Sequence, residues 1–119
     1  MKEKFTYLEI DENNKVPMCF NLNVLEEIQE KYGSLQKWGD VVENKEDGVP
    51  QIKDLKAGLM AMINEAIDIE NEKNGENKPP LTSKQVGRVI GQIGMNKLVE
   101  KIKEMTVEST RVDSESKNE

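Results

Sequence analysis

The chain opens with positions that alternate between apolar and polar side chains. In KFTYLEI, residues 4–10, Leu8 and Ile10 fall on one face, and Tyr7 falls on the other. The run DENNK that follows is rich in turn-forming residues, and VPMCF then resumes an apolar extended pattern. The pattern predicts a β-hairpin over residues 4–22, in which Pro17 confines the second strand to an edge. Because an isolated hairpin is marginally stable in water, we expect it to pack against the rest of the chain.

After this hairpin the spacing of apolar residues becomes that of helices. Asn21 or Asn23 can cap a first helix, and Gly33 can end it. A second short helical pattern follows and carries Trp38, the single tryptophan. The segment NKEDGVP, residues 44–50, is predicted to be a polar loop.

The longest periodic signal covers residues 51–71 and predicts a helix with one apolar stripe. Gly58 inside it costs about 1 kcal/mol relative to alanine, which packing against a buried neighbour can offset. The apolar residues recur at spacings of three and four: Ile52, Leu55, Leu59, Met62, Ile63, Ala66 and Ile67.

Residues 71–80, NEKNGENKPP, break the helical pattern. Thr82 and Gln85 then form a T-x-x-Q capping box, which marks the start of another helix. A further apolar stripe belongs either to the same helix or to one that restarts near Met95. Beyond Met105 the segment TVESTRVDSESKNE has little to bury, so we expect a disordered tail.

Together these elements predict a mainly α fold, α+β at most. We expect one small helical domain over residues 1–106, with the hairpin in 4–22 and about four to five helices in 23–106. Residues 107–119 form the predicted disordered polar tail. Short helices and few aromatic residues predict a thin core, so self-association would be a natural way to bury more surface.

Composition narrows the class of protein. The 119 residues are 34% charged with a net charge of −6, a balance that disfavours non-specific adhesion to nucleic acid or to an anionic membrane. No run is long enough for a membrane span, and no apolar segment typical of a secretory signal is present. Cys19 is the single cysteine, which suits a reducing compartment. We therefore expect a cytoplasmic protein with no membrane partner.

Catalytic and metal-binding chemistry has little to draw on in this sequence. There is no histidine, which removes Ser-His-Asp and Cys-His catalysis and histidine-bearing zinc sites. Cys19 lies in an apolar strand and is expected to be a buried, inert thiol. We expect no enzymatic activity, no catalytic residues, no metal and no cofactor.

The segment 82–103 allows an alternative function, that of a small DNA-binding transcriptional regulator with a helix-turn-helix. Exposed basic residues there would favour DNA, as would Gly91 if it were the turn glycine. With Gly91 in that place, however, core-facing positions fall on Lys97 and Glu100, which are charged. A structural interpretation is favoured, in which Gly91 or Gly94 ends a helix.

One order of features recurs along most of the chain. A hairpin is followed by FNLNVLEEIQEKYGSLQKWGD, IKDLKAGLMAMINEAI, LTSKQVGRVIGQIGMNKLVEKIKEM and a polar tail. This order resembles that of the small tail assembly chaperones of long-tailed bacteriophages and related prophages. Leu22–Gly33 matches the family's N-x-x-L-x-x-I/L segment leading to a glycine, Leu55–Ile67 its Leu/Met-rich helix, and Leu81–Ile90 its LT-x-x-x-V/A-x-x-I/L helix. The resemblance covers residues 16–106.

The resemblance implies a non-enzymatic role in the cytoplasm of a bacterial host. Such proteins coat the long, helical tape-measure protein, keep it soluble, and help the tail tube protein to polymerise around it. Apolar helix faces would bind these partners. The candidate partner-binding residues are Trp38, Leu59, Met62 and Leu98, any of which could instead belong to the core.

Overall fold

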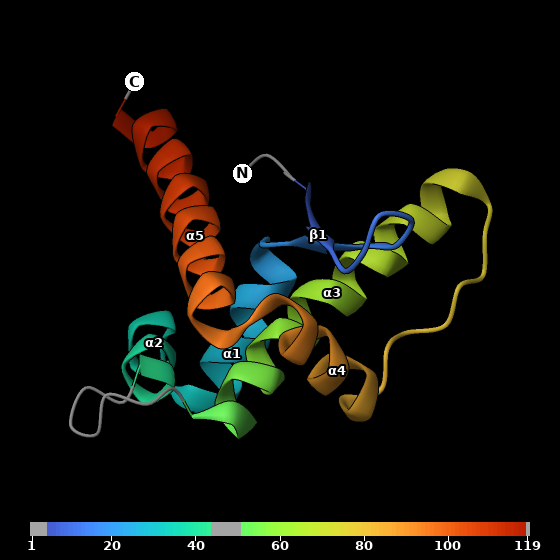
Figure 1. Cartoon of the computed structure of the whole chain (residues 1–119). Helices are drawn as coiled ribbons and strands as arrows, with labels where there is room; N and C mark the ends of the chain where they lie inside the picture. Colours follow the sequence, from blue (N-terminus) through green and yellow to red (C-terminus); the bar gives the residue numbers. More distant parts are fainter. Residues whose placement is uncertain (1–4, 44–50, 119) are drawn as a thin grey trace.

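The computed structural model describes residues 5–43 and 51–118, with side chains up to Thr106. The predicted polar loop 44–50 lies outside this part of the chain. Within it, a two-stranded hairpin precedes five helices, which confirms the predicted mainly helical domain with an N-terminal hairpin (Figure 1). The elements are β1 (Phe5–Glu9), β2 (Lys15–Cys19), α1 (Leu22–Tyr32), α2 (Leu35–Glu43), α3 (Ile52–Asn74), α4 (Ser83–Ile93) and α5 (Met95–Asn118).

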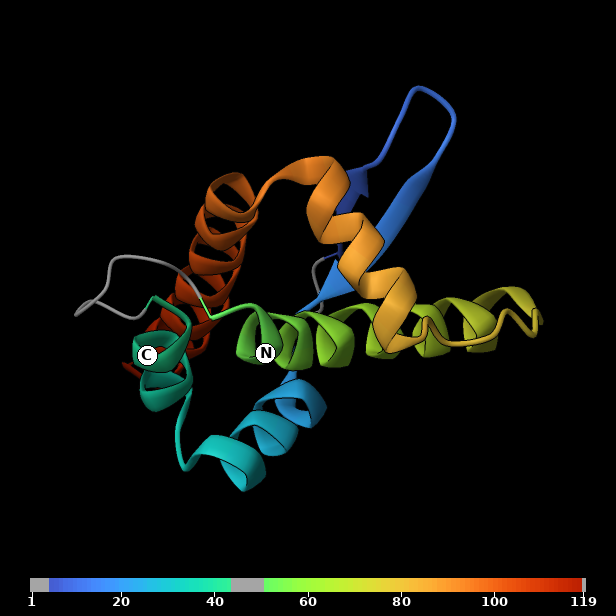
Figure 2. The ribbon, with the colours of Figure 1, turned by 60° about the horizontal axis from the view of Figure 1, so that its bottom comes forward.

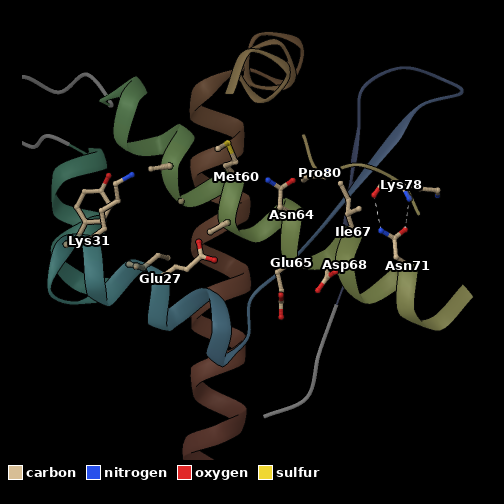
Figure 3. A pocket seen from close by; sticks show the side chains of 15 residues that line it. Glu27, Lys31, Met60, Asn64, Glu65, Ile67, Asp68, Asn71, Lys78 and Pro80 are labelled. Atoms are coloured by element: carbon tan, nitrogen blue, oxygen red, sulfur yellow. Dashed lines mark hydrogen bonds between the residues drawn. The ribbon is translucent and has the colours of Figure 1, made fainter. Parts of the chain in front are cut away.

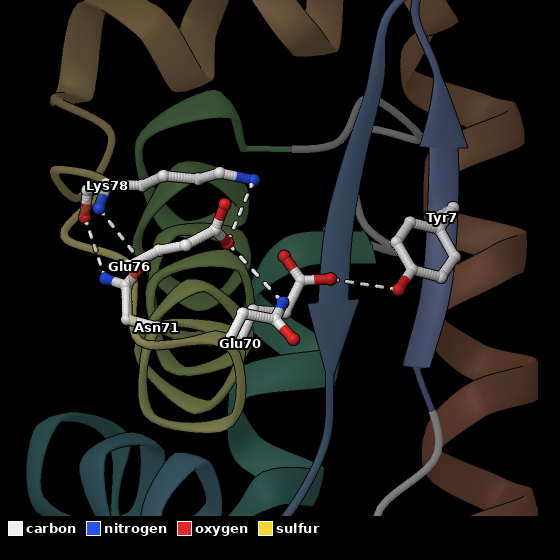
Figure 4. Close-up of polar contacts among 6 residues, drawn as sticks. Tyr7, Glu70, Asn71, Glu76 and Lys78 are labelled. Atoms are coloured by element: carbon white, nitrogen blue, oxygen red, sulfur yellow. Dashed lines mark hydrogen bonds and ion pairs between the residues drawn. The ribbon is translucent and has the colours of Figure 1, made fainter.

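The hairpin is antiparallel and packs its β2 strand along α3, which supplies the support that an isolated hairpin lacks. Its turn is organised by Asp11, whose carboxylate accepts hydrogen bonds from the side chain and backbone N–H of Asn14 and from the backbone N–H of Asn13. These bonds, that of the Asn14 side chain first, lower the pKa of Asp11. The Tyr7 hydroxyl donates to Glu70 at 2.9 Å and ties β1 to the end of α3 (Figure 4).

Helix α1 begins because Asn21 satisfies one of its free backbone donors. The Asn21 side-chain oxygen accepts from the N–H of Val24 at 3.1 Å, so Asn21 is the cap of the two predicted candidates. Gly33 ends the helix with φ of 94°, a backbone conformation that glycine adopts without strain.

Helix α3 is the central element, and β2, α1, α2 and α4 all pack against it. Figure 2 shows α3 crossing the molecule with α1 on one side and α4 on the other. Six of the seven apolar residues of the predicted stripe are buried, and Ile52 alone is exposed. The predicted interior of the helix is therefore confirmed, while its first residue faces solvent.

Helices α4 and α5 are separate and meet at Gly94. The predicted capping box is present: Thr82 and Gln85 exchange hydrogen bonds of 3.2 and 2.8 Å. Gly94 has φ of 97° and turns the chain, whereas Gly91 stays within α4. Helix α5 continues in the backbone to Asn118, and the predicted disorder of 107–119 stays a prediction.

A close contact between two residues fixes the packing of α2 on α3. A Cβ atom at Gly58 would overlap the Cζ2 and Cε2 atoms of Trp38 and lie 2.8 Å from Cη2. The Trp38 indole N–H also donates to the backbone carbonyl of Asp54 at 2.9 Å. The absence of a side chain at Gly58 thus admits the indole, which explains a glycine inside α3.

Replacing glycine by alanine at two helical positions should change the free energy of unfolding in opposite directions. We predict that Gly58→Ala destabilises the fold by about 1–3 kcal/mol, because the added methyl group forces Trp38 out of its place. Gly91→Ala, where a Cβ meets no atom within 4 Å, should stabilise it by about 0.5 kcal/mol through helix propensity. Urea unfolding of both variants measures the difference. Equal changes in the free energy of unfolding would contradict the proposed role of Gly58.

Candidate functional site

The four predicted partner-binding residues all lie in the hydrophobic core. Trp38 is 3% exposed, and Leu59, Met62 and Leu98 are 0% exposed. All four residues therefore belong to the core, the alternative that the sequence left open, and none of them forms a binding surface in this structure. Their burial follows from their size, since large apolar side chains gain most from leaving water.

An open groove runs along the face of α3 that these core residues leave uncovered. A hollow of about 460 Å³ lies between α1 and the segment 76–81, and Figure 3 shows the side chains around it. A second hollow of about 390 Å³ continues toward the start of α3 and shares Lys31, Ala57 and Met60 with the first. We call this continuous surface the α3 groove, with a floor formed by α3 from Lys53 to Asn71.

The floor of the α3 groove is apolar and shallow in its middle part. Ala57, Met60 and Ala61 are partly exposed there, and Ile52 stands 55% exposed at the mouth. The nineteen residues from Lys53 to Asn71 span about 27 Å, the length of five helical turns. The small side chains of Ala57 and Ala61, four positions apart, would let another backbone approach closely.

Helix α1 forms one wall of the groove and runs antiparallel to α3. Near one end, the Tyr32 hydroxyl donates to Asp54 at 2.7 Å. Near the other end, the side-chain amides of Asn21 and Asn23 both donate to the carboxylate of Glu65, at 2.7 and 2.9 Å. The wall is therefore fixed at both ends while the space between them stays open.

The tyrosine at the end of this wall is a stable hydrogen-bond donor. Burial, the hydrogen bond to Asp54 and the charge of that carboxylate raise the pKa of Tyr32 to about 12. Its phenol stays protonated throughout the neutral range. The contribution of this bond to stability is complete below pH 10 and is lost as the pH rises toward 12.

The second wall is an extended strap, residues 78–81, that two asparagines of α3 hold in place. The Asn71 side chain donates to the carbonyl of Lys78 at 2.9 Å and accepts from its N–H at 3.0 Å (Figure 4). Asn64 pairs with Leu81 in the same way, at 3.3 and 2.8 Å. The asparagines lie seven positions apart, two turns on one face of α3. Each side-chain amide thus replaces a backbone partner that the strap would otherwise lack.

Charged side chains of the groove are divided between its two ends. The end nearer the start of α3 carries three lysines: Lys31, Lys53 and Lys56. The other part carries three carboxylates, Glu27, Glu65 and Asp68, together with Lys78 on the strap, and Lys31 lies between the two parts and lines both hollows. An apolar floor between opposite charges suits an amphipathic helix better than a small polar molecule.

In the segment considered for DNA recognition, the structural interpretation is confirmed at its Gly94 alternative, because Gly94 ends α4. The joint is Gly94, not Gly91, and one residue separates α4 from α5. Lys97 and Glu100 are exposed and Leu98 is buried, so the charged residues occupy the solvent side of α5. The local geometry is that of two packed helices joined by a glycine, and DNA binding by it stays a prediction.

Two classes of site have no support in the described residues. No group of three or more Cys, Asp and Glu side chains there could hold a metal ion. No helix in the same part of the chain is long and apolar enough to cross a membrane.

Comparisons with known proteins find no matching family model, no similar curated protein and no similar solved structure. The α3 groove is therefore the feature of the molecule that bears on its function. The sequence did not predict this surface, although the spacing of seven between Asn64 and Asn71 on one helical face was a signal for it.

Replacing Asn64 or Asn71 of α3 should release the end of the strap that the replaced side chain holds. We predict that Asn64→Ala accelerates hydrogen exchange at the Leu81 amide, and that Asn71→Ala does so at the Lys78 amide. Each change removes the sole acceptor shown for that N–H, with a loss of about 1 kcal/mol. Residue-resolved amide exchange of the two variants provides reciprocal controls. Unchanged exchange at both amides would show that the asparagines do not hold the strap.

Proposed function

We propose that this protein is a tail assembly chaperone of a long-tailed bacteriophage or prophage. In this proposal it covers amphipathic helices of the tape-measure protein and keeps that protein soluble until the tail tube protein assembles around it. The observation that carries the proposal is the α3 groove, which is open over about 27 Å between two fixed walls and has an apolar floor in its middle part. The order of sequence features shared with such chaperones supports it.

The groove has the properties that binding a helix requires. Partly exposed Met60 offers an unbranched, adaptable side chain, and the alanines on either side leave room for a partner's apolar residues. A helix laid in such a groove buries its apolar face while its polar face stays in water. The partner helix then no longer exposes the surface through which it would aggregate.

The charge of the chain suits the same task. A net charge of −6 makes complexes repel one another, which opposes their aggregation. We place this activity in the cytoplasm of the bacterial host, where the tape-measure protein is made. The single cysteine is compatible with a reducing environment.

The test is co-expression with a tape-measure protein of a long-tailed phage or prophage, followed by measurement of its solubility and co-purification. We predict that the native chain keeps the partner soluble and elutes with it. Ala61→Glu should reduce the co-purified partner at least about tenfold, because a carboxylate on the floor would be buried without a counter-charge. Gly91→Glu is the matched control, since it adds the same charge at an exposed position outside the groove.

Two results would contradict this proposal. One is a partner that stays insoluble and unbound beside the native chain. The other is equal capture by both glutamate variants, which would place binding elsewhere. Salt-sensitive binding of duplex DNA that weakens on replacing Arg88 and Lys97 would instead support the transcriptional regulator.

A further inference from the structure

The division of charge along the α3 groove follows from how its walls are fixed. The hydrogen bond from Tyr32 to Asp54 sets the end of α1 beside the start of α3, which brings Lys31 near Lys53 and Lys56. These three side chains line the same hollow with no carboxylate among its lining residues. With three lysines and the one carboxylate of Asp54, this end of the groove is positive overall.

The opposite end is negative for a related reason. Asn21 and Asn23 hold the Glu65 carboxylate through two hydrogen bonds, and Asp68 follows one turn later on α3. Glu27 of α1 lines the same hollow. The positive charge of Lys78, also at this end, is offset by Glu76 at 3.6 Å. On α3, Lys53 and Glu65 lie twelve positions apart, about 18 Å, whereas Lys31 and Glu27 lie one turn apart on α1.

We propose that the groove selects its occupant by charge order. The occupant is an amphipathic helix of a partner protein, with Asp or Glu on the half that lies over the lysines. It carries Lys or Arg on the half over the carboxylates, about twelve residues away. This inference rests on the proposed function, because it names the kind of helix that the same groove accepts. Charge order thereby distinguishes partner helices whose apolar faces are alike.

Synthetic peptides separate charge order from hydrophobicity. Two labelled peptides of about 18 residues have the same composition and the same apolar face. The divided peptide carries its acidic residues in one half and its basic residues in the other. The interleaved peptide alternates acidic and basic residues along its whole length. We predict that the full chain binds the divided peptide about tenfold more tightly at low salt. The difference should vanish near 1 M NaCl, where the screening length is about 3 Å. The interleaved peptide forms more i,i+4 ion pairs and is therefore the more helical of the two when free. Tighter binding of the divided peptide thus does not result from a higher helix content.

Charge-reversal variants locate the effect in the groove. Lys53→Glu combined with Lys56→Glu should bring the two peptides to within about twofold of each other. Acidic residues near the start of α3 favour its helix dipole, so the variant should fold. The matched control is Lys97→Glu with Lys101→Glu, on α5 outside the groove, which should keep the tenfold preference.

The possible outcomes separate this inference from the proposed function. Equal, tight binding of both peptides that Ala61→Glu abolishes overturns charge selection and leaves the helix-binding groove in place. Loss of the preference for the divided peptide in the Lys97 and Lys101 control variant also overturns charge selection by the groove. No binding of either peptide to the native chain overturns the proposed function together with the charge order.

Discussion

The contact of the Trp38 indole with the backbone of Gly58 sets the distance between α2 and α3, the helix against which β2, α1 and α4 also pack. The bond from Trp38 to the Asp54 carbonyl and the bond from Tyr32 to the Asp54 side chain meet at the same point. One residue of α3 thereby aligns both α1 and α2. A shift at Gly58 would move the wall of the groove as well as the core.

The groove exists because α3 is longer than the elements that cover it. One face is buried under β2 and the helices, and a neighbouring face lies open between α1 and the strap, with two alanines and a methionine in its middle part. Filling that space with larger side chains would bury more apolar area and stabilise an isolated domain. An apolar surface left open between two fixed walls is better suited to binding than to stability.

The regular elements could be predicted from sequence because their signals are local. The Thr82 capping box and the buried side chains from Leu55 to Ile67 follow from spacings within one helix. The groove could not be predicted from sequence. The Asn64–Leu81 pairing joins residues seventeen positions apart and depends on how the chain returns along α3. The candidate site residues were chosen on apolar helix faces, and large side chains on such faces occupy core positions, as Trp38 does, whereas the small Ala61 carries no such signal.

Chemical-shift mapping of the full, isotopically labelled chain with a tape-measure helix tests the central claim most directly. Since binding changes the surroundings of nearby amides, the largest shifts should fall on Ala57, Met60 and Ala61 and on Leu81 of the strap. Saturable shifts at these amides would support a helix-binding α3 groove. Shifts confined to the exposed face of α4 and α5, with the groove amides unchanged, would contradict it.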